Sequence, residues 1–592
     1  MSGQTNDVSA LSQMSSADPI DAEIDALTAQ IQALSSRVTS LRAVRNDRAL
    51  ISRLPYETMT AIFRAIDDRP RIIHNDGRVV GRPWLGWIYV SHVCRMWRDI
   101  SVRHSLLWSD ISFVLGPQWT KVMFERSRAA PINIDYSIVF GHPILLDKAT
   151  LNAHMYHVRQ LSLVVPLHPT SVSHVEDLLL MVAGAAHGLE TLSLKMRPID
   201  IPPADLTGPS SIPSWLAEDF PRLRHLELHG FLIHWGPESV FPFRSLLTLK
   251  LGLPLHRVIE LDSAYLPTLP TLLTVLDQMS ELRVLHLVHI LPWIPLQNFH
   301  LLPPPQTVSL PHLTELQISG KAHECANFRR CLEISTSTMV QSFDLTSQYA
   351  TGEDLLMMSP FINSFMSSVK SCMRLALADS GQTITVIMHM PFMPNVPPHL
   401  ELRCVFMSDR HSTEDNIFPL LLGRCSFDHL TTLYIRSHMW TIPHWTRFFS
   451  MFKAIEHLTI ATIPSSVNNA QWPTFNNFFD VLAIGTGTRA SEADSALKDR
   501  PRGSHLLLPS LTVVSFFSID LTPTESDDAL RRGLLASLEC RQRSASPIKS
   551  IQFSHCKVSP RLLQSLREVV LEVVQEAEID LDTRYGVARR RT

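Results

Sequence analysis

Histidine and glutamate alternate with leucine in the stretch HLELH, residues 225–229. If this stretch forms a β-strand, His225, Glu227 and His229 point to one face of the sheet and the two leucines point to the other. Two imidazoles and a carboxylate on one face could hold a metal ion. The open face of a half-buried strand is ordinarily polar, however, and we favour that simpler interpretation of these three side chains.

Two other stretches contain residue types that are found in ligand sites. HECANFRRC, residues 323–331, offers His323, Cys325 and Cys331, which is fewer than the four ligands of a structural zinc. VLAIGTGTRA, residues 481–490, fits the GxGxxA pattern of dinucleotide-binding loops, but a polar stretch follows it where the nucleotide-binding helix should begin. The sequence contains no HExxH, GxSxG or P-loop pattern. We therefore expect neither an enzyme nor a resident metal or cofactor.

The strand that would carry HLELH belongs to a repeated unit, L-x-x-L-x-L, which recurs from about residue 150 onward. Its clearest copies are LETLSL at 189, LRHLEL at 223, LLTLKL at 246, LRVLHL at 282, LTELQI at 313, LTTLYI at 430 and IEHLTI at 455. Helical stretches such as TLLTVLDQM separate many of the copies. A single unit cannot bury its own leucines, so strand alternating with helix at a repeated period predicts stacked neighbours. We expect an α/β solenoid of irregular leucine-rich repeats over residues 150–592.

The repeat is imperfect. Successive units, measured from the fourth position, are 23 to 36 residues apart, so several units carry insertions. The Asn or Cys that commonly follows the last leucine of such a unit is missing. The copies fade between residues 345 and 428, where two or three degenerate units would fit. A capping helix is expected at 559–580, where it would cover the open edge of the last strand.

The residue between the second and third leucines of each unit points outward, on the sheet face opposite the core. Along the chain this position forms a polar stripe of mixed charge: Ser162, Ser193, Glu227, Lys250, His286, Gln317, Asp344, Tyr434 and Thr459. From this stripe we select as candidate target-binding residues Glu227, Lys250, His286, Gln317 and Tyr434. The alternative is that this face is merely solvated and that a target protein binds the longer insertion loops.

The amino-terminal residues have a different character. Residues 1–19 are rich in Ser and Asp, and we expect them to be disordered. Apolar residues then recur at alternating spacings of three and four: Ile24, Leu27, Ile31, Leu34, Val38 and Leu41. This is the a/d seam of a coiled coil, although the flanking e and g positions 28 to 44 hold almost no complementary charges. Residues 20–49 are therefore either a weak homodimer element through 24–41 or a single helix lying on the next domain.

The segment 50–116 predicts two short helices, each with an apolar stripe. A Leu-Pro pair at Leu54 and Pro55 opens the first helix, and a polar insertion at 67–83 separates the two. The apolar positions recur at i, i+3, i+4 and i+7 in both helices: Met59, Ile62, Phe63 and Ile66 in the first, and Val90, Val93, Cys94 and Trp97 in the second. Two helices of this length expose more apolar surface than they can bury in each other. Part of that surface should therefore meet another protein.

LPYETMTAIF, VSHVCRMWRDI and LLWSDI, in this order, resemble the F-box domain in the divergent form found in multicopy fungal proteins. The resemblance implies a small all-α domain that docks on the small adaptor subunit of a cullin–RING ubiquitin ligase. It implies that the residues facing the adaptor include Leu54, Pro55, Ile62 and Phe63. It further implies that adaptor contact and the core of the domain are shared by Val93, Cys94 and Trp97. The alternative is that the segment is a two-helix corner of the larger domain.

Composition narrows the function classes further. The chain has 592 residues and a net charge of −3, too little positive charge for nucleic acid as the main partner. The first residues lack the charged start and apolar core of a secretory signal, and no apolar run approaches the length of a membrane span. Eight scattered cysteines without CxxC spacing fit a reducing compartment. We expect a cytoplasmic or nuclear protein without membrane contact.

Together these features predict the substrate-receptor subunit of an SCF-type ubiquitin ligase. Such a protein docks the adaptor through its F-box-like helices and a target protein through its repeats. It catalyses nothing itself and acts by proximity. The alternative is a leucine-rich-repeat scaffold that no longer binds the ligase adaptor.

Overall fold

The computed structural model describes residues 19–66, 74–75, 78–79, 85–137, 148–166, 187–197, 211–212, 220–233, 235, 244–253, 266–292, 306–334, 340–347, 374–379, 383–389, 400–406, 427, 430–436, 442–461, 473–483, 506–517, 519–521 and 527–576. The chain divides into two compact units, the first formed by residues 1–136 with 142–161 and the second by residues 137–141 with 162–592. Most of the N-terminal stretch for which we expect disorder lies outside the described residues.

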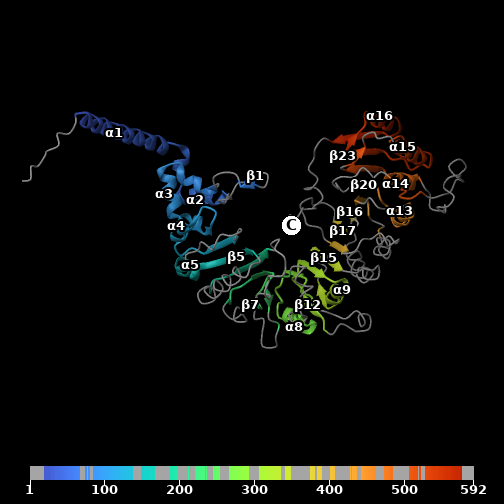
Figure 1. Ribbon diagram of the computed structural model, residues 1–592, viewed down its shortest axis with the longest axis horizontal. Helices are drawn as coiled ribbons and strands as arrows, with labels where there is room; N and C mark the ends of the chain where they lie inside the picture. The colour runs from blue at the N-terminus through green and yellow to red at the C-terminus, as the bar shows by residue number, and fades with distance from the viewer. Residues whose placement is uncertain are drawn as a thin grey trace, which may run out of the picture. The chain divides into compact units, whose positions relative to one another are not determined.

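The first unit is mainly helical (Figure 1). Its helices are α1 (Pro19–Asp47), α2 (Tyr56–Ala65), α3 (Arg95–Arg103), α4 (Pro117–Ser127) and α5 (Lys148–His154), with the 3-10 helices η1 (Leu50–Arg53), η2 (Gly86–His92), η3 (Ser105–Trp108) and η4 (Met155–His157). Among its strands, β1 (His74–Asn75) pairs antiparallel with β2 (Arg78–Val79), and β3 (Asp110–Ile111) pairs in parallel with β4 (Ile132–Ser137). Residues 50–116, for which the resemblance implies an all-α domain, therefore also contain the short strands β1, β2 and β3.

Trp108 is the centre of the core of the first unit. Its side chain is fully buried, and its Nε1 donates to the carbonyl oxygen of Ser101 at 2.8 Å. Trp87 packs edge-on against it with ring centroids 4.8 Å apart, and the guanidinium of Arg126 lies 4.4 Å from the ring centroid. Arg126 belongs to α4, which also contacts η3 and β3. The domain boundary that we expect at 116 therefore falls inside the first unit.

The second unit is built on a mostly parallel sheet. The paired strands, in spatial order, are β6 (Thr191–Arg197), β8 (His225–His229), β10 (Thr248–Gly252), β11 (Val284–Val288), β13 (Glu315–Gly320), β15 (Val340–Ser347), β18 (Leu400–Phe406), β17 (Thr383–His389), β16 (Arg374–Asp379), β19 (Thr432–Arg436), β20 (His457–Ala461), β21 (Val513–Phe517), β23 (Ser550–Ser554) and β25 (Glu572–Glu576). Small parallel pairs accompany this sheet: β7 (Ser211–Ile212) with β9 (Leu232–Ile233), β12 (Val308–Leu310) with β14 (Leu332–Ile334), and β22 (Asp520–Leu521) with β24 (Lys557–Val558). Strand β5 (Val158–Pro166) spans the boundary between the two units.

Leucines form continuous buried rows across this sheet. In β8, Leu226 and Leu228 are buried while the residues on either side of each are partly exposed. The register places Leu226 opposite Leu249 of β10, and Leu249 opposite Leu285 of β11. Full burial of one such side chain stabilises the fold by about 1.5–3 kcal/mol. The L-x-x-L-x-L unit is therefore a strand whose second and third leucines enter the core, as its alternation predicts.

The middle of the second unit departs from the repeat. Residues 345–428 leave room for two or three degenerate units, and the described part of this region contains β16, β17 and β18. Strand β17 runs antiparallel to both of its neighbours. Strand β18 pairs with β15 and β16 pairs with β19, both in parallel, so the three strands lie in the sheet in reversed order. An antiparallel strand cannot be one more copy of a parallel strand–helix unit, so β17 is not a degenerate repeat.

Helices line one face of the sheet of the second unit (Figure 1). They are α8 (Leu269–Asp277), α9 (Ala322–Arg330), α13 (Ile442–Phe449), α14 (Pro473–Ala483), α15 (Asp527–Arg543) and α16 (Pro560–Val569). Helix α9 contacts β13 and β15, and α16 contacts β25. The hydroxyl oxygens of Thr268 and Ser559 accept backbone N–H groups at the starts of α8 and α16, and a proline stands in the first turn of each helix.

The capping helix expected at 559–580 is shorter than predicted. Helix α16 ends at Val569, and Val570 has an extended backbone with φ −116° and ψ 140°. The following strand, β25, pairs in parallel with β23. Its sequence EVVQE contains two β-branched valines, which favour a strand over a helix. The last element that the structure describes is thus a strand of the sheet.

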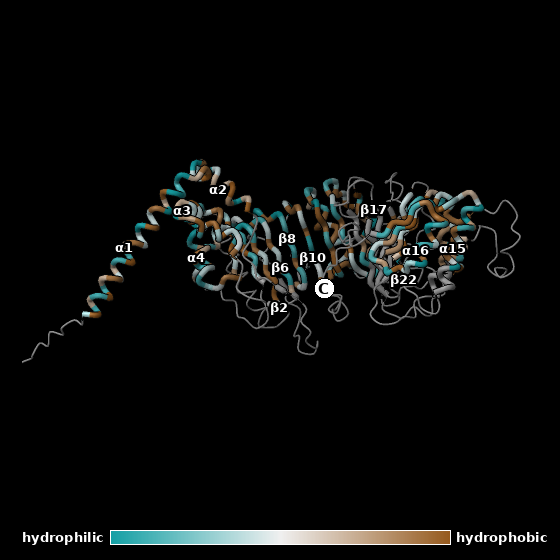
Figure 2. The backbone as a smooth tube through the Cα atoms, turned by 90° about the horizontal axis from the view of Figure 1, so that it is seen from above, coloured by the Kyte–Doolittle hydropathy of each residue, from teal (hydrophilic) through white to brown (hydrophobic). Residues whose placement is uncertain are grey.

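Helix α1 is the longest helix among the described residues, with 29 residues. Figure 2 shows hydrophobic positions recurring between hydrophilic ones along its length. None of the helices that the structure describes has both the length and the apolar character needed to cross a membrane.

Candidate functional site

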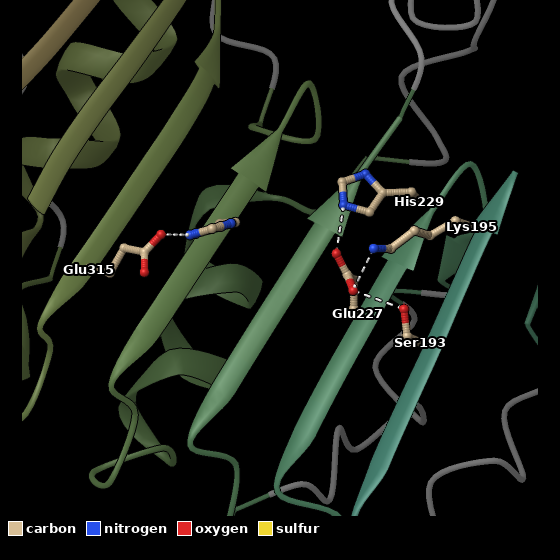
Figure 3. Close-up of polar contacts among 6 residues, drawn as sticks. Ser193, Lys195, Glu227, His229 and Glu315 are labelled. Carbon is tan, nitrogen blue, oxygen red and sulfur yellow. Dashed lines mark hydrogen bonds and ion pairs between the residues drawn. The ribbon is translucent and has the colours of Figure 1, made fainter. Parts of the chain in front are cut away.

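Glu227 on β8 is the centre of a polar cluster on the open face of the sheet, which we call the Glu227 cluster: Ser193, Lys195, Glu227 and His229 (Figure 3). Ser193 Oγ donates to Glu227 Oε2 at 2.8 Å, and Lys195 Nζ lies 3.0 Å from the same oxygen. His229 Nε2 lies 3.6 Å from Glu227 Oε1. The register of β6 with β8 sets Ser193 opposite Glu227 and Lys195 opposite His229, so strand pairing alone brings these side chains together.

The electrostatics of the cluster keep the carboxyl group of Glu227 charged near neutral pH. Burial by itself would raise the pKa of Glu227, but contacts with His229, Lys195 and Ser193, together with the charge of Lys195, lower it to about 2. A carboxyl group with this pKa exchanges no proton near neutral pH. The cluster is therefore suited to recognition by fixed charges and hydrogen bonds, and not to general acid–base chemistry.

Two more contacts between neighbouring strands follow on the same face. His286 Nε2 on β11 lies 2.7 Å from Glu315 Oε1 on β13. His225 Nδ1 on β8 lies 3.0 Å from Thr248 Oγ1 on β10. These pairs join adjacent strands across the sheet and hold the imidazoles in place. The face is therefore a fixed array of polar groups.

Lys250 and Gln317 differ from these neighbours. Lys250 stands in register between Glu227 and His286, and Gln317 follows His286 on the next strand. Within the described part of the chain, the side chains of Lys250 and Gln317 form no hydrogen bond or ion pair. Both are partly exposed. They are available to a binding partner.

Four of the five candidate target-binding residues lie in one row. Glu227, Lys250, His286 and Gln317 occupy neighbouring strands in register. Tyr434 does not join them, because β15, β18, β17 and β16 separate its strand β19 from the strand of Gln317. Tyr434 therefore lies outside this row, and its part in target binding stays a prediction. The reversed strand order between β15 and β19 is the physical reason.

Two further details of the polar stripe predicted on the open face of the sheet need correction. Asp344 pairs with Ser319, and the residue opposite Gln317 is Ser342, so Asp344 lies two residues out of register. His286 is 8% exposed, less than a solvated stripe residue would be. Its ring nitrogen contacts Glu315 on the neighbouring strand, which ties it to the sheet.

The sequence pattern missed Ser193 and Lys195 as partners of Glu227, and Glu315 as the partner of His286. Each could have been found from the same pattern. Lys195 lies two residues beyond Ser193, and Glu315 two residues before Gln317, so all four share the stripe's face. What the pattern could not give is the strand-to-strand register that sets each pair side by side.

The metal interpretation of HLELH is not supported by the side-chain geometry. His225, Glu227 and His229 do share one face, but His225 contacts Thr248 while His229 contacts Glu227. The part of the chain that the structure describes contains no group of three His, Cys, Asp or Glu side chains arranged to hold a metal.

Neither of the other two motifs, HECANFRRC at 323–331 and VLAIGTGTRA at 481–490, has the structural context of a ligand site in the described residues. His323, Cys325 and Cys331 are all buried at helix α9, and Cys331 Sγ donates to the carbonyl oxygen of Asn327 at 3.4 Å. Residues 484–490 of the GxGxxA stretch lie outside the described residues. The apolar run before them ends helix α14, whereas a dinucleotide-binding loop follows a strand.

The second candidate surface lies on the helices of the first unit, and α2 divides its apolar residues between two environments. Met59 and Phe63 are buried, whereas Ile62 and Ile66 are 39% and 38% exposed. Leu54, just before the helix, is 37% exposed. The expectation that the apolar residues of this helix share one docking face is therefore wrong for Phe63, which packs in the core.

The apolar stripe that we predict for the second helix of segment 50–116 is divided between two elements. Cys94 has an extended backbone, with φ −155° and ψ 171°, and precedes the first residue of α3. Val90 lies in η2 and is buried, Val93 is 59% exposed, and Trp97 lies in α3 with its ring against Phe63. A single helix over these positions is therefore wrong. Pro55 is likewise the residue that precedes the first turn of α2, not a member of it.

No family model and no curated protein matches this chain.

Proposed function

We propose that this protein is a substrate-receptor subunit of a cullin–RING ubiquitin ligase. In this proposal an F-box-like domain binds the small adaptor subunit of the ligase, and an irregular leucine-rich-repeat solenoid binds a target protein. The protein is not an enzyme and needs no cofactor. It acts in the cytoplasm or nucleus by holding a target lysine near a ubiquitin donor.

The observation that carries the proposal is the distribution of exposed apolar side chains. Among the described residues, all the large exposed hydrophobic side chains except Tyr156 and Leu571 lie between residues 20 and 114. Those of the F-box-like segment are Leu50, Ile51, Leu54, Tyr56, Ile62, Ile66, Tyr89, Val93, Leu106 and Val114. Soluble proteins seldom leave so much apolar surface on one segment unless another protein covers it.

The exposed residues of α2 are held by a packed core. Ile62 lies within α2, and Ile66 directly follows its last residue with a non-helical backbone. Met59 and Phe63, on the adjoining part of the same apolar face, are buried and fix the orientation of the helix. A rigid apolar ridge of this kind loses little conformational entropy on binding, which supports adaptor docking through Leu54, Ile62 and Val93.

The open face of the sheet supports a protein target. The rows of buried leucines and the parallel register favour a leucine-rich-repeat solenoid as the architecture. The opposite face presents the Glu227 cluster together with Lys250 and Gln317, a mixture of both charge signs with hydrogen-bonding groups. A phosphate backbone or a lipid surface would call for one sign of charge, so a peptide or protein surface is the better match.

The alternative function is a leucine-rich-repeat scaffold that has lost adaptor binding. The observation in its favour is the extended backbone at Cys94, which divides residues that the resemblance places on one helix. Binding of the purified adaptor subunit to the full-length protein distinguishes the two. Binding that is lost in Ile62→Asp supports the receptor, and absence of binding by the wild type supports the scaffold.

A further inference from the structure

The apolar seam of α1 is exposed along its whole length. Its six a and d residues are each 46% to 64% exposed: Ile24, Leu27, Ile31, Leu34, Val38 and Leu41. Ile20, at the preceding d position, is 63% exposed. The interpretation of this helix as lying with its seam on the next part of the chain is therefore wrong. Six regularly spaced aliphatic side chains exposed on one helix are expected to be buried by another surface.

We propose that this seam pairs with the same seam of a second copy of the chain, with the two α1 helices antiparallel. In this pairing Ile24 lies opposite Leu41 of the second copy, Leu27 opposite Val38, and Ile31 opposite Leu34. The two-fold symmetry of the dimer repeats each of these three pairs, so all six apolar residues of each helix are buried. The inference concerns α1 alone and does not depend on adaptor binding.

Apolar packing does not choose the direction, because a parallel, in-register dimer covers the same six positions. In parallel coiled coils, β-branched residues at a with leucine at d give two strands. The parallel dimer is therefore the competing arrangement. The residues that flank the seam distinguish the two.

The flanking charges favour the antiparallel direction. In a parallel dimer each g residue meets the e residue of the next heptad, so Arg37 faces Arg42 of the other chain, twice. In the antiparallel dimer e faces e and g faces g. Asp21 then faces Arg42 of the second copy, twice, and Gln30 faces Arg37. Two repulsive contacts are replaced by two attractive ones.

The ends of α1 reinforce this choice. Acidic residues lie in its first turns, at Asp21, Glu23 and Asp25, and basic residues in its second half, at Arg37, Arg42 and Arg45. An antiparallel pair brings the acidic end of each helix to the basic end of the other. It also opposes the two helix dipoles. The C-terminal ends of the two helices then lie about 40 Å apart along the pair, at 1.5 Å per residue, which keeps the following helices of the two copies separate.

Charge reversal at Arg42 tests the direction, because the two arrangements predict opposite results. The dimer dissociation constant is measured on the full-length protein by sedimentation. The antiparallel dimer predicts that Arg42→Glu weakens association about tenfold, since two attractive pairs become repulsive. The charge-swapped variant, which combines Asp21→Arg with Arg42→Glu, should return to within about twofold of the wild type. Arg53→Glu in η1 changes the net charge equally and should have no effect.

Tighter association of Arg42→Glu would overturn the proposal, because only in the parallel dimer does this substitution give Arg37 an oppositely charged partner. A wild-type chain that stays monomeric at tens of micromolar would overturn it as well.

Disulfide cross-linking provides a second test with a different readout. A mixture of Leu27→Cys and Val38→Cys proteins should form the heterodimeric cross-link on mild oxidation, and each variant alone should not exceed the wild-type background from native cysteines. Efficient self-cross-linking of Leu27→Cys alone would establish the parallel dimer and overturn the antiparallel one.

Discussion

The ring of Phe63 on α2 packs against the indole of Trp97 on α3, with ring centroids 5.1 Å apart and planes inclined by 53°. Phe63 is 1% exposed, whereas the adjacent Ile62 is 39% exposed. The F-box resemblance implies that both residues of α2 face the adaptor. The packing instead separates a core residue from a surface residue. A test of docking must therefore change Ile62 and leave Phe63 in place.

Phe63→Ala should destabilise the first unit by about 3–5 kcal/mol, because it removes a buried aromatic ring and leaves a cavity against Trp97. Hydrogen exchange of the full-length protein should show faster exchange in α2 and α3. The matched variant Ile62→Ala should change the free energy of unfolding by no more than about 1 kcal/mol. Equal protection of α2 in Phe63→Ala and the wild type would contradict the assigned core.

The Glu227 cluster should make the second unit acid-sensitive. The pKa of Glu227 is about 2 in the fold, against an ordinary value of 4.5. A carboxyl group with a lowered folded-state pKa stabilises the fold above its unfolded pKa, and this stabilisation is lost as the pH falls through the folded pKa. The wild type should therefore be more stable than Glu227→Gln near neutral pH, and the difference should shrink between about pH 4.5 and pH 2.

Denaturant unfolding of both proteins at a series of pH values, with hydrogen exchange in β6 and β8, measures this difference. Glu539→Gln on α15, where the glutamate side chain is 56% exposed, is the control. A stability difference between wild type and Glu227→Gln that is the same at pH 7 and pH 3 would be incompatible with the cluster.

Lys250 and Gln317 should contribute to target binding with little effect on the fold. Replacing both with alanine should shift the free energy of unfolding by about ±0.5 kcal/mol, since neither side chain has a hydrogen-bonding partner within the described residues. Quantitative mass spectrometry should show that the double variant recovers less of the target protein than the wild type does, while the other co-purified proteins are unchanged. Lys453→Ala, at an exposed position beyond α13, is the control. Unchanged recovery of every partner would assign the target site elsewhere.

Arg541 on α15 should be essential to the C-terminal part of the second unit. Its guanidinium is fully buried and donates to the carbonyl oxygens of Leu482, Leu507 and Leu508 at 3.4, 3.0 and 2.7 Å. Burial lowers the pKa of Arg541 to about 10, so the side chain remains charged at neutral pH.

Arg541→Met should cost about 3 kcal/mol or more, because it leaves these buried carbonyl groups without their donor. Arg543→Met is the matched control, since the side chain of Arg543 is 74% exposed. Hydrogen exchange in α14 and α15 measures the free energy of local unfolding in both variants. Equal effects of the two substitutions would contradict the role given to Arg541.

Local patterns in the sequence predicted the strands well. The L-x-x-L-x-L alternation places Leu226 and Leu228 in the core and Glu227 on the open face, because side-chain direction in a strand follows from position alone. The same pattern could not predict the sheet order between β15 and β19. That order depends on pairing between distant segments, and it removes Tyr434 from the row of candidate residues.

Helical periodicity was a weaker guide in the first unit. The spacing of Val90, Val93, Cys94 and Trp97 fits one helix, but the extended backbone at Cys94 places them in two elements. Periodicity also cannot tell the core side of an apolar helix from a docking side when both are apolar. Only the packing of Phe63 on Trp97 decides which side of α2 remains for a partner.

The most direct test of the proposed function is a calorimetric titration of the purified ligase adaptor into full-length wild-type protein and two variants. The receptor predicts saturable one-to-one binding by the wild type and, for Ile62→Asp, an affinity weaker by about 30-fold or more, since loss of a central apolar interface contact costs about 2 kcal/mol. Leu571→Asp changes an apolar side chain that is 90% exposed in the second unit, and it should bind as the wild type does. No binding by the wild type, or equal binding by Ile62→Asp, would contradict the account.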